Sequence, residues 1–251
     1  MKASSNKRFW EVKASAESKK IGEVYIYGSI VPYRQDDEDT TAMSFKKDLE
    51  ALGEIDTLNL YVNSPGGSVF QAQAIYSIIA RQKAEKNAYI DGLAASAASF
   101  LIMAADKIYM PKNATMMVHN PMALVIGNAK DLRREADALD KIRVGMIEAY
   151  LAHAGDKLSE EKLKELLDAE TWLTAEESYS YGFVDELIDA KEIAACVDMD
   201  LFSVYRNTPK SLLEGRKGSV NLEEEARLRS EIAAESEATI ETVGKILRRL
   251  N

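Results

Sequence analysis

Short runs rich in β-branched residues alternate with runs of helical periodicity along most of this chain, from about residue 22 to residue 188. The strand-like runs cover 23–31, 57–62, 87–91 and 107–119, the last of which holds two strand candidates. The helical patterns cover 41–53, 68–81 and 129–154. Strict alternation of this kind is typical of an α/β fold with largely parallel strand pairing. The sequence therefore predicts an α/β core.

The chain divides into three predicted segments. Residues 1–21 form an N-terminal segment, and residues 22–206 form the main domain. Residues 207–251 begin with a linker and continue as a stretch dense in Glu, Arg and Ala, with only a thin apolar stripe. Such a stretch favours a projecting charged helical arm over a part of the main core.

Charge and composition exclude several classes of function. The net charge of −9 and the sequence pI near 5.0 argue against a phosphate-binding surface, so we expect no nucleic-acid partner. One cysteine and two histidines exclude an internal disulfide and argue against a metal site, and we expect no cofactor. The N-terminus lacks the apolar region of a secretory signal, and no apolar run reaches the ~20 residues that span a bilayer. We expect a cytoplasmic protein without a membrane partner.

Two serines interrupt an apolar run of fourteen uncharged residues, 92–105, which predicts a buried helix after Gly92. Buried hydroxyls need hydrogen-bond partners. Ser96 and Ser99 therefore either bond to nearby backbone carbonyls or lie at a surface prepared for a reactive hydroxyl. Small residues around them can serve close helix–sheet packing. They also allow a substrate backbone to approach, with the N–H of Ala97 aimed at a developing oxyanion.

The two histidines have different settings. His119 ends an apolar strand candidate and precedes Asn120-Pro121, and ligands bind at strand ends of α/β sheets. A packed core histidine is the alternative there. His153 lies just before the expected helix end at Gly155, where a cation-capable ring interacts with helix carbonyls. We expect His153 to be structural.

The loop "NSPGGS" (63–68) joins a predicted strand to a predicted helix. One interpretation is a tight turn, in which Pro65 presets φ and Gly66 takes a positive φ. The other is that Gly67 exposes its backbone N–H to a ligand with no side chain in the way. The loop is not a P-loop, because the Lys-Ser/Thr ending is missing.

Taken together, these motifs resemble those of the ClpP-like serine peptidases. The resemblance rests on NSPGG, on G-x-A-A-S with its serine 29 residues after Gly67, on H-x-P 23 residues later, and on the closing segment 172–187. It extends from about residue 22 to residue 188. It implies the ClpP/crotonase spiral of ββα units and a serine endopeptidase, a hydrolase that works through an acyl-enzyme.

The resemblance also assigns roles to individual residues. Ser96 becomes the nucleophile and His119 the general base, with Glu170 at the position of the family's third triad member. The implied oxyanion-hole donors are Gly67 and Ala97, and the implied substrate-binding residues are Gly66, Ser68 and Gly127. Ser99, one turn after Ser96, is expected to bond within its own helix.

Two departures from the family pattern matter. The family has an Asp two residues before an aromatic residue, whereas this chain has Glu170 before Trp172. Asp168 is the alternative acid. After His119, the chain keeps a matching Gly127 but carries Ala123-Leu124 where the family often has a glycine pair. Addition of a substrate strand there remains the expectation, with a changed pocket.

The resemblance further implies a homo-oligomer of stacked rings of subunits, with helix 129–154 between the rings and protein or peptide as substrate. Extensions such as the arm resemble those of short ClpP-like proteins of phage and prophage head-gene clusters. This implies a capsid-maturation protease that acts on capsid or scaffold protein, in the host cytoplasm or the assembling phage head. An ATPase partner is left open. The alternatives are a crotonase-like acyl-CoA enzyme and a catalytically inactive ClpP-like scaffold.

Overall fold

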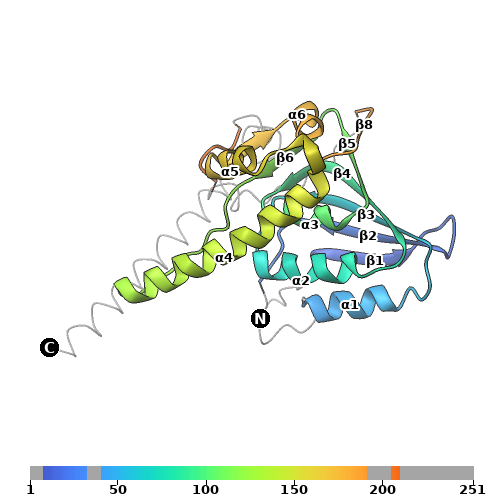
Figure 1. Ribbon diagram of the computed structural model, residues 1–251. Helices are drawn as coiled ribbons and strands as arrows, with labels where there is room; N and C mark the ends of the chain where they lie inside the picture. Colours follow the sequence, from blue (N-terminus) through green and yellow to red (C-terminus); the bar gives the residue numbers. More distant parts are fainter. Residues whose placement is uncertain (1–7, 33–40, 191–204, 210–251) are drawn as a thin grey trace, which may run out of the picture. The chain divides into compact units, whose positions relative to one another are not determined.

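The structure is a computed structural model, and it describes residues 8–32, 41–190 and 205–209 (Figure 1). Residues 8–32, 41–190 and 205–208 belong to one compact unit, which ends at Thr208. The predicted helical arm lies outside the described residues from residue 210 onward.

Strands and helices alternate as the sequence predicts. The described strands are β1 (Trp10–Ala14), β2 (Ile21–Tyr27), β3 (Thr57–Ser64), β4 (Glu85–Ala95), β5 (Lys107–Pro111), β6 (Thr115–Val118), β7 (Thr171–Leu173) and β8 (Glu186–Ile188). The described α-helices are α1 (Ala42–Glu50), α2 (Val69–Ala80), α3 (Ala97–Leu101), α4 (Ala129–Ala154), α5 (Glu160–Asp168) and α6 (Ala175–Ser180). Short 3₁₀ turns cover Ile102–Ala104 and Gly155–Lys157.

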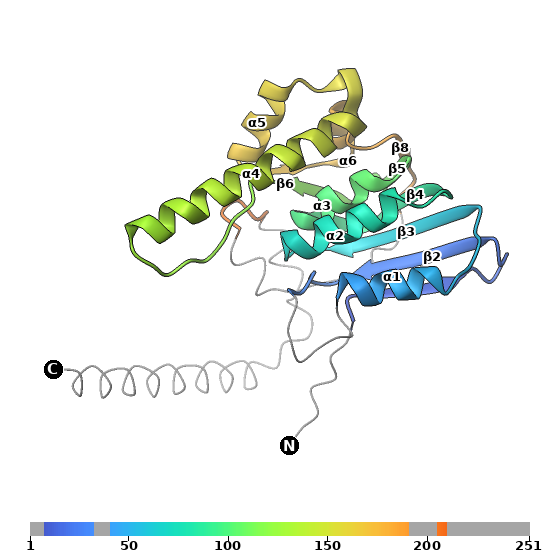
Figure 2. The same cartoon turned by 60° about the horizontal axis from the view of Figure 1, so that its bottom comes forward.

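The strands form one sheet with the order β1-β2-β3-β4-β5-β8. Strands β2, β3, β4, β5 and β8 pair in parallel, and β1 adds an antiparallel edge ahead of residue 22, where the predicted main domain begins. Strand β6 pairs in parallel with the far end of β4, and β7 pairs antiparallel with β6. Figure 2 shows the helices lying along the sheet. The predicted α/β class with largely parallel pairing is confirmed.

Parallel register places four tyrosines side by side on one face of the sheet. Tyr25, Tyr61, Tyr89 and Tyr109 are direct partners on adjacent strands. Their rings stack with centroid separations of 4.8, 5.3 and 4.8 Å along the row. The alternate residues of these strands point to the opposite face and are buried in the core. The period of two in the sequence therefore separates a helix-covered face from a tyrosine face.

The segment after Gly92 differs from the prediction. The sequence predicts a helix over the apolar run from this residue, but residues up to Ala95 are strand, and α3 begins only at Ala97. The reason is strand pairing: Leu93 and Ala95 lie opposite residues of β6, so the backbone N–H and C=O groups of this stretch form hydrogen bonds within the sheet. The stretch has no amphipathic period that would favour a helix. Small residues are thus used here in a buried strand.

Helix α4 has the predicted bounds, 129–154, and Asn128 caps it in a reciprocal capping box with Asp131. Its apolar stripe is buried only toward the C-terminal end, where Met146 and Tyr150 enter the core. Leu132 in the first half is exposed. Figure 1 shows this first half extending past the sheet. No helix among the described residues is long and apolar enough to cross a membrane.

Candidate active site

Ser96 lies at a sharp turn between strand and helix. Strand β4 ends at Ala95, α3 begins at Ala97, and Ser96 between them has φ 55° and ψ −124°. A non-glycine residue seldom adopts a positive φ, and such conformations cost on the order of 1–3 kcal/mol. The backbone N–H of Ser96 donates to the carbonyl of Met117 at 2.9 Å. Strand β6 therefore holds the turn in place.

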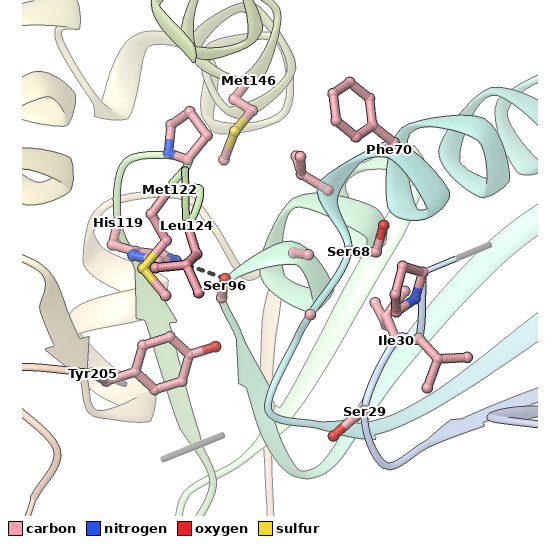
Figure 3. Close-up of a pocket in the computed structure, with 16 residues that line it drawn as sticks. Ser29, Ile30, Ser68, Phe70, Ser96, His119, Met122, Leu124, Met146 and Tyr205 are labelled. Carbon is pink, nitrogen blue, oxygen red and sulfur yellow. Dashed lines mark hydrogen bonds between the residues drawn. The ribbon is translucent and has the colours of Figure 1, made fainter. Parts of the chain in front are cut away.

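The Ser96 hydroxyl contacts the imidazole of His119. Its Oγ lies 2.6 Å from Nε2 of His119, a hydrogen-bond distance (Figure 3). The contact follows from the sheet, since Ala95 on β4 is the partner of Met117 on β6. Ser96 and His119 each come directly after these parallel strands, so both side chains leave the sheet at the same edge. Both residues are 8% exposed.

Burial sets the protonation of His119. Removal from water lowers the pKa of the imidazole below its ordinary value of 6.5, and the nearby Glu170 carboxylate opposes this shift in part. A lowered pKa keeps the imidazole neutral at pH 7. A neutral imidazole can accept the proton of the Ser96 hydroxyl, as a general base must.

The loop 63–68 approaches Ser96 so closely that only glycine fits. A Cβ on Gly66, which has φ 94°, would lie 2.7 Å from the Cβ of Ser96. A Cβ on Gly67, which has φ 135°, would overlap the carbonyl oxygen of Ile30. Two hydrogen bonds of 2.7 Å fix the loop: the N–H of Ile30 donates to the carbonyl of Gly66, and the N–H of Ser68 donates to the carbonyl of Ile30.

This arrangement leaves two backbone N–H groups near Ser96. Ile30 and Gly67 form an isolated parallel β-bridge, and its two hydrogen bonds are donated by the N–H groups of Ile30 and Ser68. The N–H of Gly67 therefore takes no part in the bridge. Ala97 is the first residue of α3, and the first N–H groups of a helix have no intrahelical partner. Donors beside a nucleophilic oxygen can stabilise an oxyanion that forms there.

Ser64 shapes the same loop, and sequence reasoning missed it. Its hydroxyl donates to the carbonyl of Gly28 at 2.7 Å and accepts from the N–H of Gly66 at 3.1 Å. The side chain is fully buried. A serine at the end of an apolar strand was the available signal, because a hydroxyl in that position must bond to backbone.

Ser99 satisfies its hydroxyl inside the protein. Its Oγ lies 2.7 Å from the carbonyl oxygen of Ser96 and 2.8 Å from that of Met117, so it can donate to either. The hydroxyl of Tyr150, 2.8 Å away, can donate to it in return. Ser99 is fully buried. The predicted bond within its own helix is confirmed.

The two candidate acids have different surroundings. Asp168 accepts from the side-chain amide of Asn120 and pairs with Arg143, both at 2.8 Å, and its side chain is largely exposed. Glu170 follows the end of α5 with φ 50° and acts electrostatically on His119. Among the hydrogen bonds of the described residues, none joins a carboxylate to His119.

The segment 205–207 reaches the site from a part of the sequence that suggested no role. The hydroxyl of Tyr205 donates to the carbonyl of Pro65 at 2.6 Å, and its ring meets that of His119 edge to face at 5.4 Å. The backbone N–H of Asn207 donates to Oε1 of Glu170 at 2.7 Å. A single tyrosine at the end of a short, mainly apolar run (201–205) carries no periodic signal, so sequence reasoning could not find it.

A cleft of about 830 Å³ opens over Ser96 and His119. Figure 3 shows Ser96 between His119 on one side and Ser68 and Ile30 on the other, with the Tyr205 hydroxyl pointing toward it. Its further lining is mainly apolar: Val31, Pro32, Val69, Phe70, Ala97, Pro121, Met122, Leu124 and Met146, with Ser29 and Gly67.

Three predicted site residues need separate mention. Ser68 lines the cleft but also caps α2 by accepting from the N–H of Gln71. Gly66 shapes the loop, and Gly127 abuts Asp131 at the start of α4. Neither glycine is among the lining residues, so their contact with substrate remains a prediction.

His153 lies away from this cleft. Its Nε2 is 3.1 Å from Oδ2 of Asp185, which also accepts from the N–H of Ile108. The imidazole thereby ties the end of α4 to the start of β5 and to the turn before β8, a structural position. Within the described part of the chain, no three His, Cys, Asp or Glu side chains gather in a way that could hold a metal ion.

Two comparisons with known proteins show what the chain is similar to. A family model described as Clp protease matches residues 15–191, more than half of the chain. The ATP-dependent Clp protease proteolytic subunit 2 of Mycolicibacterium paratuberculosis is 33% identical over 133 residues. That match covers 52% of this chain and 66% of the relative, just under two thirds of its length.

Proposed function

The chain belongs to the Clp protease family, and we propose from this premise that it is a serine endopeptidase in which Ser96 is the nucleophile. The observation that carries the proposal is the 2.6 Å contact between Oγ of Ser96 and Nε2 of His119, at the mouth of an apolar cleft. A serine hydroxyl is a weak nucleophile until an adjacent base accepts its proton.

The reaction follows from the positions of the groups. Nε2 of His119 accepts the hydroxyl proton as Oγ of Ser96 attacks the substrate carbonyl carbon, and the carbonyl oxygen gains the negative charge. The N–H groups of Gly67 and Ala97 donate to that oxygen. The protonated imidazole then gives its proton to the leaving amine, and an acyl-enzyme on Ser96 remains. Water activated by the same imidazole hydrolyses this ester.

Glu170 is proposed as the acid that orients His119 and stabilises the imidazolium. Its support is the electrostatic action of its carboxylate on the imidazole. Asp168 is engaged by Asn120 and Arg143 instead, which argues against it. The Asn207 N–H holds one carboxylate oxygen of Glu170, and the other is proposed to face Nδ1 of His119 when the imidazole is charged.

The substrate is proposed to be an extended peptide. The apolar lining of the cleft, including Phe70 and Met146, suits an apolar side chain beside the scissile bond. Gly66, Ser68 and Gly127 are proposed to allow close approach of the substrate backbone. Subunits are proposed to assemble as stacked rings, with α4 between them, since the first half of this helix is exposed.

The biological substrate is proposed to be a capsid or scaffold protein of a phage. Its support is the resemblance of the C-terminal extension to those of short ClpP-like head proteins, and the chain continues for 60 residues beyond the matched family region (251 − 191). A cytoplasmic location accords with this role.

Labelling by a fluorophosphonate tests the proposal. The wild type is expected to form a covalent adduct and to cleave an unstructured protein substrate, and Ser96→Ala to do neither. Ser77→Ala, an exposed helical serine, is the matched control and should label as wild type does. Labelling of Ser96→Ala at the wild-type rate would show another nucleophile. A wild type without labelling would favour the inactive scaffold, and turnover of an acyl-CoA would favour a crotonase-like enzyme.

A further inference from the structure

Residues 205–207 belong to the site although they follow the region that matches the family. The matched region ends at residue 191, fourteen residues before Tyr205. Tyr205 is nevertheless 7% exposed, packed with Leu93, Ala95 and Met117 in a small apolar cluster beside the cleft. A buried tyrosine keeps its hydroxyl bonded to a partner.

The hydroxyl of Tyr205 fastens the loop that carries the oxyanion donor. It donates to the carbonyl oxygen of Pro65 at 2.6 Å, and Pro65 directly precedes Gly66 and Gly67. Burial raises the pKa of this hydroxyl to about 12, so it stays a donor at every pH at which the enzyme is expected to work. Without this bond, the Pro65 carbonyl would lose its buried partner.

The ring of Tyr205 covers the imidazole of His119. The rings of Tyr205 and His119 meet edge to face, with an interplanar angle of 82°. The ring of Trp172 also packs against that of Tyr205, with ring centroids 6.0 Å apart. Water is thereby kept from one side of His119. Asn207 anchors the same segment, because its side-chain amide donates to the carbonyl of Ala169 at 2.8 Å.

We propose that Tyr205 is a positioning residue for the Ser96–His119 pair, and this inference rests on the proposed function. The hydroxyl fixes the oxyanion loop through Pro65, and the ring excludes water from His119. The two effects are separable by chemistry. Tyr205→Phe removes the hydroxyl and keeps the ring, whereas Tyr205→Ala removes both.

The charged and titratable groups around His119 are few. Glu170 acts on it from the turn before β7, Ser96 contacts it from the turn after β4, and Tyr205 covers it. Asp168 and Arg143 neutralise each other beside Asn120. Where Asn207 still holds Glu170 in place, a change in the titration of His119 on loss of the Tyr205 ring therefore reports a change in its hydration.

Two measurements test the proposal on the full chain. The first is the pKa of His119 by NMR with ¹³Cε1-labelled histidine, which is simple because the chain has two histidines and His119→Ala assigns them. Tyr205→Ala should raise the pKa of His119 toward the ordinary value of about 6.5, and Tyr205→Phe should leave it unchanged. Tyr179→Ala, which removes an exposed tyrosine on α6, is the control and should not change it.

The second measurement is the rate of fluorophosphonate labelling above the His119 pKa. Tyr205→Phe should label about five- to tenfold more slowly, the effect of one lost hydrogen bond on the transition state, with its pH midpoint unmoved. A wild-type labelling rate in Tyr205→Phe overturns the proposal, as does an unchanged His119 pKa in a folded Tyr205→Ala. If Tyr205→Ala does not fold, the Tyr205→Phe rate decides. If the wild type is not labelled at all, the peptidase proposal fails, and the NMR titration alone decides the role of Tyr205.

Discussion

The positive φ of Ser96 predicts that glycine at this position gives a more stable protein than alanine. At φ 55° and ψ −124°, the Cβ of any L-residue is crowded by its own backbone, whereas glycine adopts this region freely. Ser96→Gly and Ser96→Ala both remove the hydroxyl and its contact with His119. The difference between them therefore reports the backbone strain, reduced by the greater freedom of glycine in the unfolded chain.

The size of this difference follows from two opposed terms. Relief of an unfavourable conformation is worth on the order of 1–3 kcal/mol. The greater freedom of glycine in the unfolded chain offsets about 0.4–1 kcal/mol of it. Ser96→Gly should therefore exceed Ser96→Ala in free energy of unfolding by roughly 1–2 kcal/mol. For a domain of this size, each kcal/mol corresponds to about 2–4 °C in Tm.

Urea unfolding followed by far-UV circular dichroism measures the difference, at one protein concentration so that any assembly contributes equally. Ser99 offers the matched control, since it lies three residues on in the regular part of α3. There, glycine should be less stable than alanine by about 1 kcal/mol. The reasoning fails if glycine is the less stable residue at both positions, because Ser96 would then carry no strain that glycine relieves.

Three further predictions concern the chemistry. His119→Ala should lose fluorophosphonate labelling, whereas His153→Ala should keep most of it. In urea unfolding, His153→Ala should lose only the modest contribution of a histidine at a helix end, ~1 kcal/mol. Equal loss of labelling in both variants at equal stability would contradict a structural role for His153. The rate of labelling should rise with pH through a midpoint below 6.5, because burial lowers the pKa of His119 and only the neutral imidazole accepts the Ser96 proton. A rate that stays flat from pH 5 to pH 7.5 would count against His119 as the base. Glu170→Gln should reduce kcat strongly, by up to ~10⁴-fold as in the best-studied triad, and Asp168→Asn only slightly; a reversed order would make Asp168 the orienting acid, and wild-type kcat in both would leave a Ser–His dyad.

Much of the fold could be predicted because it follows from the spacing of apolar residues and from the order of strands and helices along the chain. Helix α4 has its predicted bounds, since Asn128 is a strong cap and Gly155 ends the helix with a positive φ. The edge on which Ser96 and His119 meet also follows from parallel pairing. The start of α3 was predicted wrongly, because an alanine-rich run has no amphipathic period, and the pairing of β4 with β6 decides its conformation.

Long-range contacts made by single residues could not be predicted. Ser64 bonds to Gly28 and Tyr205 to Pro65, and neither pair has a spacing or a pattern that connects its members. The strain at Ser96 was likewise absent from the sequence, because propensity says nothing about one residue held in place by a neighbouring strand.

The bond between Tyr205 and Pro65 joins residues 140 positions apart, and this separation imposes an order in time. During synthesis the loop at Pro65 leaves the ribosome first, and at about 5–20 residues per second the tyrosine follows roughly 7–30 s later. His119 follows Pro65 by 54 residues, and from its synthesis until that of Tyr205 the Ser96–His119 pair lacks the residue that fastens the loop and shields the imidazole. On the role proposed for Tyr205, a nascent chain is a poor hydrolase until the segment that carries Tyr205 docks, so the protein reaches full reactivity only after its sheet is complete.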